Sequence, residues 1–219
     1  MKILITGSSK GIGLAVSKFF LDKGYEVVGI DLLPSSIDNL NYKHYICDIQ
    51  NYDDLPNIED IDYLFNNAGL QNSKSDIQNN LIGTMNVTKK YGFQKSIKSI
   101  LFNASASASS GFEFEEYVAS KAGIVGYMKT VAYKAATSGA TCNSLSLGGV
   151  LTDSNDVVMN DPKLWKQIMD VTPLKKWTTL DEVCEWVYFL LVTNKSMSGQ
   201  DILVDNGERD LNCTFVWPT

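Results

Sequence analysis

The chain has 219 residues, and its hydrophobic fraction of 44% is ordinary for one α/β domain with a full core. A net charge of −6 disfavours a nucleic-acid partner, and no apolar run suggests a membrane span or a signal peptide, which favours the cytoplasm. Four scattered cysteines without a C-x-x-C pair favour reduced thiols over disulfides or a metal site. The single histidine, His44, argues against a Ser-His-Asp triad.

The first expected elements are a strand, a glycine-rich turn and a helix. Residues 2–6 form an apolar run, Gly7, Gly11 and Gly13 follow in a short turn, and apolar residues then recur at helical spacing. A helix N-terminus carries free N–H groups and a partial positive charge, and glycine lets a phosphate approach the backbone closely. The stretch therefore predicts a dinucleotide site, although its spacing is G-x-x-x-G-x-G rather than the commoner G-x-G-x-x-G.

The second expected strand covers residues 25–31 and ends in Asp31, roughly 20 residues beyond the glycine turn. An acid in this place can accept hydrogen bonds from an adenosine ribose. It also repels a 2′-phosphate, by about 4 kcal/mol at close range and intermediate dielectric. Asp31 therefore predicts NAD over NADP, because Lys10 in the turn is too flexible and exposed to reverse that preference.

The central part of the chain continues the alternation of strands and helices. A turn-rich connection at 34–41, without a proper helix, leads to a third strand at 44–47, and a fourth strand covers 61–65. Helices are expected over 76–94 and 116–137, on either side of a fifth strand at 97–103 and a small-residue segment at 106–111. Tyr117 and Lys121 lie four residues apart on the later helix, so they share a face.

The last third holds a sixth strand at 141–147, a long segment at 150–178 expected to be a lid or binding loop, and a seventh strand at 201–205. A helix at 181–192 is expected to be capped by Thr179 or Asp181. The alternation predicts a single Rossmann-like α/β domain over residues 1–219, a doubly wound parallel sheet of about seven strands with helices on both faces. Ligands bind at the carboxyl ends of such strands, where Asp31, Asn66 and Ser105 are expected.

Five sequence features follow one another in a fixed order. They are T-G-x-x-x-G-I-G at 6–13, N-N-A-G at 66–69, N-x-x-G at 80–83, Ser105, and Y-x-x-x-K at 117–121. Y-x-x-x-K alone is a weak signal, but the order and spacing of the whole set argue against chance. In this set the chain resembles the short-chain dehydrogenase/reductase family, most of all bacterial 3-oxoacyl-carrier-protein reductases. The resemblance implies an oxidoreductase that moves a hydride between NAD(H) and an alcohol or ketone.

The resemblance implies catalytic roles for four residues. Tyr117 would exchange a proton with the substrate, and Lys121 would hold the nicotinamide ribose and lower the pKa of Tyr117. Ser105 would hydrogen-bond the substrate oxygen, and Asn80 would belong to a water-linked proton relay. The implied cofactor-binding residues are Gly7, Ser9, Lys10, Gly11, Ile12, Gly13, Asp31, Asp48, Ile49, Asn67, Ala68, Gly69, Tyr117, Lys121, Val150 and Thr152, and no metal is implied.

The chain departs from the family pattern in three places. Leu147-Gly148 stands where the family usually has Pro-Gly, Asp205-Asn206-Gly207 replaces Asp-Gly-Gly, and the segment between Gly69 and Asn80 is shorter than usual. That segment usually walls the substrate site and leads into a helix used for tetramer packing. We therefore expect a more open site and a homo-oligomer that is either a dimer or a tetramer.

Two other functions remain open at this point. One is a non-catalytic dinucleotide-binding protein, such as a redox sensor or scaffold. The other is a sugar-nucleotide epimerase or dehydratase with the same tyrosine and lysine, although such enzymes are usually longer. Within the leading hypothesis the substrate is a small alcohol or ketone. An acyl-carrier substrate fits poorly, because an acidic chain with one arginine, Arg209, lacks the basic surface that docks an acidic carrier.

Overall fold

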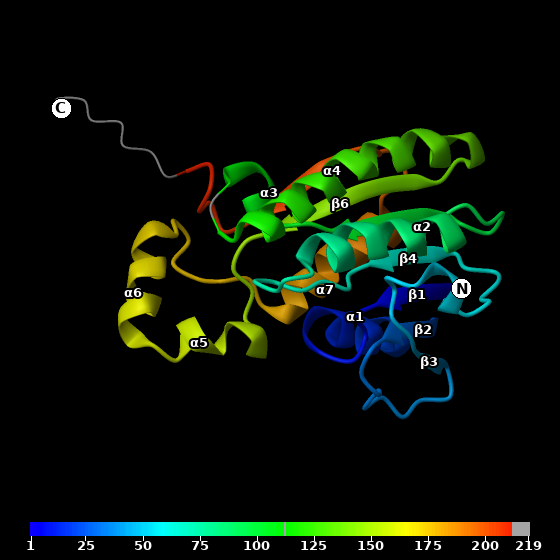
Figure 1. Cartoon of the computed structure of the whole chain (residues 1–219), viewed down its shortest axis with the longest axis horizontal. Helices are drawn as coiled ribbons and strands as arrows, with labels where there is room; N and C mark the ends of the chain where they lie inside the picture. The colour runs from blue at the N-terminus through cyan, green and yellow to red at the C-terminus, as the bar shows by residue number, and fades with distance from the viewer. Residues whose placement is uncertain (112, 212–219) are drawn as a thin grey trace.

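The structure is a computed structural model that describes residues 1–111 and 113–211, and a parallel sheet forms its centre (Figure 1). Within these residues the sheet has seven strands in the order β3-β2-β1-β4-β5-β6-β7, and every neighbouring pair is parallel. The strands are β1 Lys2–Thr6, β2 Glu26–Asp31, β3 Tyr42–Ile46, β4 Tyr63–Asn66, β5 Ser99–Asn103, β6 Thr141–Leu147 and β7 Asp201–Val204. The predicted Rossmann-like α/β fold is therefore confirmed.

Helices cover both faces of this sheet (Figure 1). Two of them, α1 Gly11–Asp22 and α7 Leu180–Tyr188, pack on one face, whereas α2 Thr84–Tyr91 and α4 Glu115–Ala135 pack on the other. The central strand β1 shows why both faces need cover. Ile3 and Ile5 belong to the hydrophobic cluster on the α1 side and Leu4 to the cluster on the α4 side, because successive side chains of a strand point to opposite faces.

Shorter helical elements complete the chain. They are η1 Tyr52–Asp54, the π-helix η2 Ile77–Gly83, α3 Ser107–Ser110, η3 Ala136–Ser138, η4 Asp153–Asn155, α5 Asp156–Met159, α6 Pro162–Val171 and the π-helix η5 Phe189–Thr193. The α5–α6 segment stands out to one side of the sheet in Figure 1. No helix in the described part of the chain combines the length and the apolar character needed to cross a membrane.

The structure confirms several predicted elements at or near their expected bounds. Strands β1 and β6 have the predicted bounds, and the connection from β2 to β3 contains no helix. Thr179 caps α7 through a capping box with Glu182: the Thr179 hydroxyl accepts the Glu182 N–H at 3.2 Å, and the Glu182 carboxylate accepts the Thr179 N–H at 2.9 Å. His44 is a residue of β3, within the predicted third strand.

Other boundaries were wrong. The third strand begins at Tyr42 rather than His44, because the pairing of β3 with β2 already begins between Tyr42 and Val27. The segment at 150–178 is not a loop, since α5 and α6 lie within it, and Asp161 caps α6 by accepting the N–H groups of Lys163 and Leu164. The small-residue segment at 106–111 contains α3, and the helix expected over 76–94 divides into η2 and α2. Cys213 and the apolar residues Phe215 and Trp217 lie outside the described residues.

Candidate active site

The glycine turn joins β1 to α1 in a conformation that glycine permits. Gly7 and Gly11 have φ values of 69° and 53°, in the left-handed region. A Cβ on Gly13 would lie 1.9 Å from the Gly7 carbonyl oxygen, whereas a Cβ on Gly11 would meet nothing within 4 Å. The turn therefore has no room for a side chain at Gly13, whereas at Gly11 the space at the N-terminus of α1 is open. This geometry fits a phosphate group held by backbone N–H groups.

Asn67 fastens the turn to the rest of the sheet. Its Nδ2 donates to the Thr6 carbonyl at 3.0 Å and to the Gly7 carbonyl at 3.3 Å, and its Oδ1 accepts from Asn103 Nδ2 at 2.9 Å. Thr6 Oγ1 also accepts the N–H groups of Asn67 and Ala68, each at 3.0 Å. The predicted residues of the glycine turn and of the N-N-A-G segment therefore lie side by side.

Asp31 lies at the carboxyl end of β2, beside the same turn. Its Oδ2 accepts the Ser9 N–H and its Oδ1 accepts the Leu33 N–H, both at 2.9 Å. Each carboxylate oxygen has a further lone pair, so the group can still accept from ribose hydroxyls. Lys10, the N-cap residue of α1, is exposed. These residues could contact the ribose of a dinucleotide bound at the turn.

The other predicted cofactor residues differ from one another in burial and in their contacts. Asp48 is half-buried and accepts the Gln50 N–H at 2.9 Å, whereas Ile49 is buried against Gly83, where a Cβ would lie 2.7 Å from Ile49 Cγ1. Val150 is buried and bridges to Thr178, and its carbonyl accepts from Asn155 Nδ2 at 2.8 Å. Thr152 is half-buried at the start of η4.

Tyr117 and Lys121 lie on the same side of α4. The Lys121 Nζ is 5.6 Å from the centroid of the Tyr117 ring and donates to the Asn103 carbonyl at 2.8 Å. A Cβ on Gly69 would lie 3.5 Å from the same Nζ, so the amine lies beside the N-N-A-G segment and, through Asn67, beside the glycine turn. Lys121 is 4% exposed, and burial lowers its pKa to about 8.

The Tyr117 hydroxyl lies close enough to the Ser105 side chain for Ser105 to affect its pKa. Burial raises the pKa of Tyr117 to about 12, the Ser105 side chain opposes this, and the negative charges of Glu113 and Asp76 add to it. With the protein's own groups alone, the pKa of Tyr117 therefore lies above its ordinary value and not below it, contrary to the expectation. The physical reason is that the free energy needed to remove the phenolate from water is larger than the stabilisation that the neighbouring groups give it.

Asn80 lies in the π-helix η2, with its side chain committed to the protein. Its Oδ1 accepts the Leu70 N–H at 2.7 Å, and its Nδ2 donates to the Leu70 carbonyl at 2.8 Å and to Ser120 Oγ at 3.0 Å. It thus joins the short segment after Gly69 to α4, next to Lys121. A wide helical turn of this kind often marks a functional site.

Several residues of this cluster were missed at the sequence level. Ser107 donates its hydroxyl to Ser105 Oγ at 2.9 Å, and the Asn103 carbonyl accepts from Lys121. Asp76 is buried near Tyr117 and Lys121, and Glu113 lies near both and accepts from Gln71 Nε2 at 3.1 Å. Only Asp76 had a usable signal, since it lies one helical turn before Asn80.

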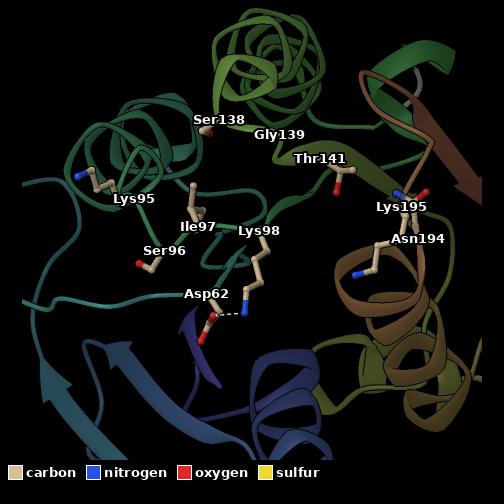
Figure 2. Close-up of a pocket in the computed structure, with 10 residues that line it drawn as sticks. All are labelled: Asp62, Lys95, Ser96, Ile97, Lys98, Ser138, Gly139, Thr141, Asn194 and Lys195. Carbon is tan, nitrogen blue, oxygen red and sulfur yellow. Dashed lines mark ion pairs between the residues drawn. The ribbon is translucent and has the colours of Figure 1, made fainter.

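A separate cavity lies at the other end of the sheet. Figure 2 shows this space of about 560 Å³, lined among others by Lys95, Lys98, Thr141 and Asp62, at the amino ends of β4, β5 and β6. The Lys98 ammonium is already paired with the Asp62 carboxylate at 2.6 Å. None of the predicted site residues lines it, so it lies apart from the Tyr117 cluster. Among residues 1–111 and 113–211, no group of three or more His, Cys, Asp or Glu side chains could hold a metal ion.

Comparison with known proteins finds sequences that are similar over most of the chain. Residues 7–208 match a family model described as enoyl-(acyl carrier protein) reductase. The 3-oxoacyl-(acyl-carrier-protein) reductase of Buchnera aphidicola is 27% identical over an alignment of 234 positions. The alignment covers 93% of this chain and 95% of that protein. The acetoacetyl-CoA reductase of Paracoccus denitrificans is 28% identical over 220 residues, covering 85% of this chain and 88% of that protein.

A solved structure supports the fold independently. A short-chain dehydrogenase family protein from Francisella tularensis superimposes with a TM-score of 0.82 at 27% identity, covering 94% of this chain and 98% of that one.

Proposed function

Because this chain belongs to the short-chain dehydrogenase/reductase family, it is an oxidoreductase that acts with NAD(P), and we propose that it is an NAD-dependent enzyme for a small alcohol or ketone. One observation carries the proposal. Tyr117 lies near Ser105 and with the Lys121 amine at the carboxyl edge of the sheet, and Asn67 and Gly69 connect this cluster to the glycine turn. This arrangement supports the proposal, because a dehydrogenase needs its proton-transfer groups close to the bound nucleotide.

The residues divide the chemistry between them. The bound nicotinamide would supply or accept the hydride. Tyr117 donates a proton to the substrate oxygen during reduction and takes it back during oxidation. Ser105 hydrogen-bonds the same oxygen as charge develops there, and Ser107 orients Ser105 through the 2.9 Å contact between their hydroxyls. Lys121 places a positive charge near the phenol and so favours its loss of the proton.

The preference for NAD is supported by Asp31. Its carboxylate is held beside the turn by the N–H groups of Ser9 and Leu33, so it cannot easily turn away from a 2′-phosphate. The exposed Lys10 has no such fixed position. A negative charge held at this place favours a free ribose over a phosphorylated one.

The substrate is proposed to be a small molecule rather than an acyl-carrier protein. The one arginine, Arg209, is bonded to the Asp210 carboxylate at 2.7 Å and to Ser109, so its charge is already paired. The α5–α6 segment follows β6 in the chain, and Trp165 on α6 packs against Trp177 at a centroid distance of 5.0 Å. We also propose a cytoplasmic homo-oligomer, which the exposed aromatic pair Trp186 and Phe189 on the α7–η5 helix supports.

The test is turnover of NADH with a panel of small ketones, comparing the wild-type chain with Tyr117→Phe. We expect the variant to lose activity by about a hundredfold or more while NADH binding is kept, because only the proton donor is removed. The matched control is Tyr133→Phe, on the same helix but 83% exposed, which should leave activity unchanged. Saturable NADH binding with no turnover of any ketone or alcohol would instead indicate the non-catalytic dinucleotide-binding protein.

A further inference from the structure

We propose that Asp76 is a positioning residue of this active site, a buried negative charge that keeps the Lys121 ammonium charged beside Tyr117. The inference rests on the proposed function, because it assigns a role within the same site.

Burial lowers the pKa of Lys121 and so disfavours its charged form. It is 4% exposed, and its one hydrogen bond among the described contacts goes to the Asn103 carbonyl at 2.8 Å. No carboxylate of the described residues lies within 4.0 Å of it as an ion-pair partner. A buried ammonium whose hydrogen bond goes to a neutral carbonyl is stabilised further by negative charges at a greater distance.

Asp76 is placed to be that charge. It is 1% exposed and directly precedes η2, four residues before Asn80. Asn80 in turn bonds Ser120, the neighbour of Lys121 on α4, so η2 and α4 are held together at this level. Asp76 Oδ1 accepts the Ser73 N–H at 3.1 Å and the Ser73 hydroxyl. Its Oδ2 is buried and has no hydrogen-bond partner among the described residues.

The orphan oxygen is what separates Asp76 from an ordinary loop-capping acid. A carboxylate that only caps a turn has no reason to be fully buried with one oxygen unsatisfied, which costs about 1–3 kcal/mol when no compensation exists. A nearby ammonium supplies that compensation across several ångströms, because charges interact strongly where water is excluded.

The charged groups that face Lys121 can be named. Asp76 and, after it, Glu113 raise the pKa of Lys121 against the larger lowering that burial causes. Glu113 comes from the segment before α4, is exposed and is bonded to Gln71 Nε2. Asp76 is the buried one of the two, so its field is less screened by solvent. The same two acids raise the pKa of Tyr117.

Asp76 acts in the same direction on Lys121 and on Tyr117, so its effect can be stated for the two groups together. Because Asp76 raises the pKa of both Lys121 and Tyr117, removing its charge makes the pair release its first proton at a lower pH. Reduction needs a pair that still holds the proton to be donated, so it would fail at a lower pH than in the wild type. The ammonium that favours proton loss from the phenol would also be lost earlier.

The experiment is a titration of Lys121 itself, which does not depend on turnover. In protein carrying ¹³C-labelled lysine, the Lys121 signal is identified by its absence from Lys121→Met, and its midpoint is followed by NMR. We expect a midpoint near 8 in the wild type, and one about a unit lower in Asp76→Asn. Where turnover is observed, the alkaline limb of the reduction rate should move by the same amount.

Two variants separate charge from structure. Ser73→Ala loosens the loop but keeps the carboxylate, and Asp53→Asn removes an exposed acid, so both should leave the Lys121 midpoint in place. Asp76→Ser is a second neutral replacement, used if Asp76→Asn does not fold. An unchanged midpoint in the neutral variants, or a wild-type midpoint already well below neutrality, would overturn the proposal. Neither result would bear on whether the protein reduces ketones.

Discussion

Gly13→Ala tests whether the glycine turn is a cofactor cradle that depends on close approach of its own backbone. The added Cβ would lie 1.9 Å from the Gly7 carbonyl oxygen and 2.7 Å from Asn67 Nδ2. Both are fixed, because Asn67 Nδ2 donates to the Gly7 carbonyl at 3.3 Å and to the Thr6 carbonyl at 3.0 Å. The turn can therefore accept the methyl group only by moving as a unit.

The magnitude follows from that distance. The carbonyl would have to retreat by about 1 Å to reach even 3.0 Å, below which Cβ contacts are essentially never found. Overpacking of this kind costs about 1–3 kcal/mol, which lowers the melting temperature of a chain of this length by roughly 2–12 °C. Since the displaced N–H groups are those proposed to bind the phosphates, NADH affinity should also fall, by at least about tenfold.

Thermal unfolding and NADH fluorescence titration measure the two effects separately. Gly126→Ala is the matched control, because this glycine lies in α4 and a Cβ there meets nothing within 4 Å. The control should be stabilised by about 0.5–1 kcal/mol, the ordinary gain of alanine over glycine in a helix, with NADH binding unchanged. Wild-type affinity and stability in Gly13→Ala would refute the reasoning about the turn.

Three further predictions use other contacts. Asp31→Ser should raise the affinity for NADPH relative to NADH by at least about tenfold in a fluorescence titration, because it removes the repulsive carboxylate. Thr179→Ala should cost about 1 kcal/mol in chemical denaturation, because the capping box with Glu182 is lost. Burial alone would raise the pKa of Asp62, but Lys98 and the Lys2 N–H hold it below its ordinary value. Asp62→Asn should therefore destabilise the protein at neutral pH, and the difference should vanish as the pH falls through that lowered pKa.

The sequence predicts the sheet well because the strands carry their own signal. The run at 2–6 and that at 141–147 are bounded by glycines or small residues, and both match their strands in the structure. The edge strand β3 was less clear, because it is only partly buried and Ile46 is 66% exposed. Where one face does not need apolar cover, the alternation that marks a strand is weak.

The segment at 150–178 shows a different limit. None of the residues of α6 is buried, so its helical form depends on local features such as the Asp161 cap and Pro162 rather than on core packing. Treating the segment as a loop because it interrupts the alternation overlooked that signal. The cap and the proline after it are visible in the sequence, whereas the contact between Trp165 and Trp177 depends on the tertiary fold.

The sequence predicts that Tyr117 and Lys121 lie together, but it does not predict how burial changes their pKa values. Spacing of four on a helix brings Tyr117 and Lys121 together, as the structure shows, but it says nothing of how much water reaches them. Burial then moves the two groups in opposite directions, raising the pKa of the phenol to about 12 and lowering that of the amine to about 8. A negative neighbour opposes this lowering of the Lys121 pKa and so helps the amine to keep its charge. Because the short segment after Gly69 leads directly into η2, the acid at its end, Asp76, is the buried group in position to do so.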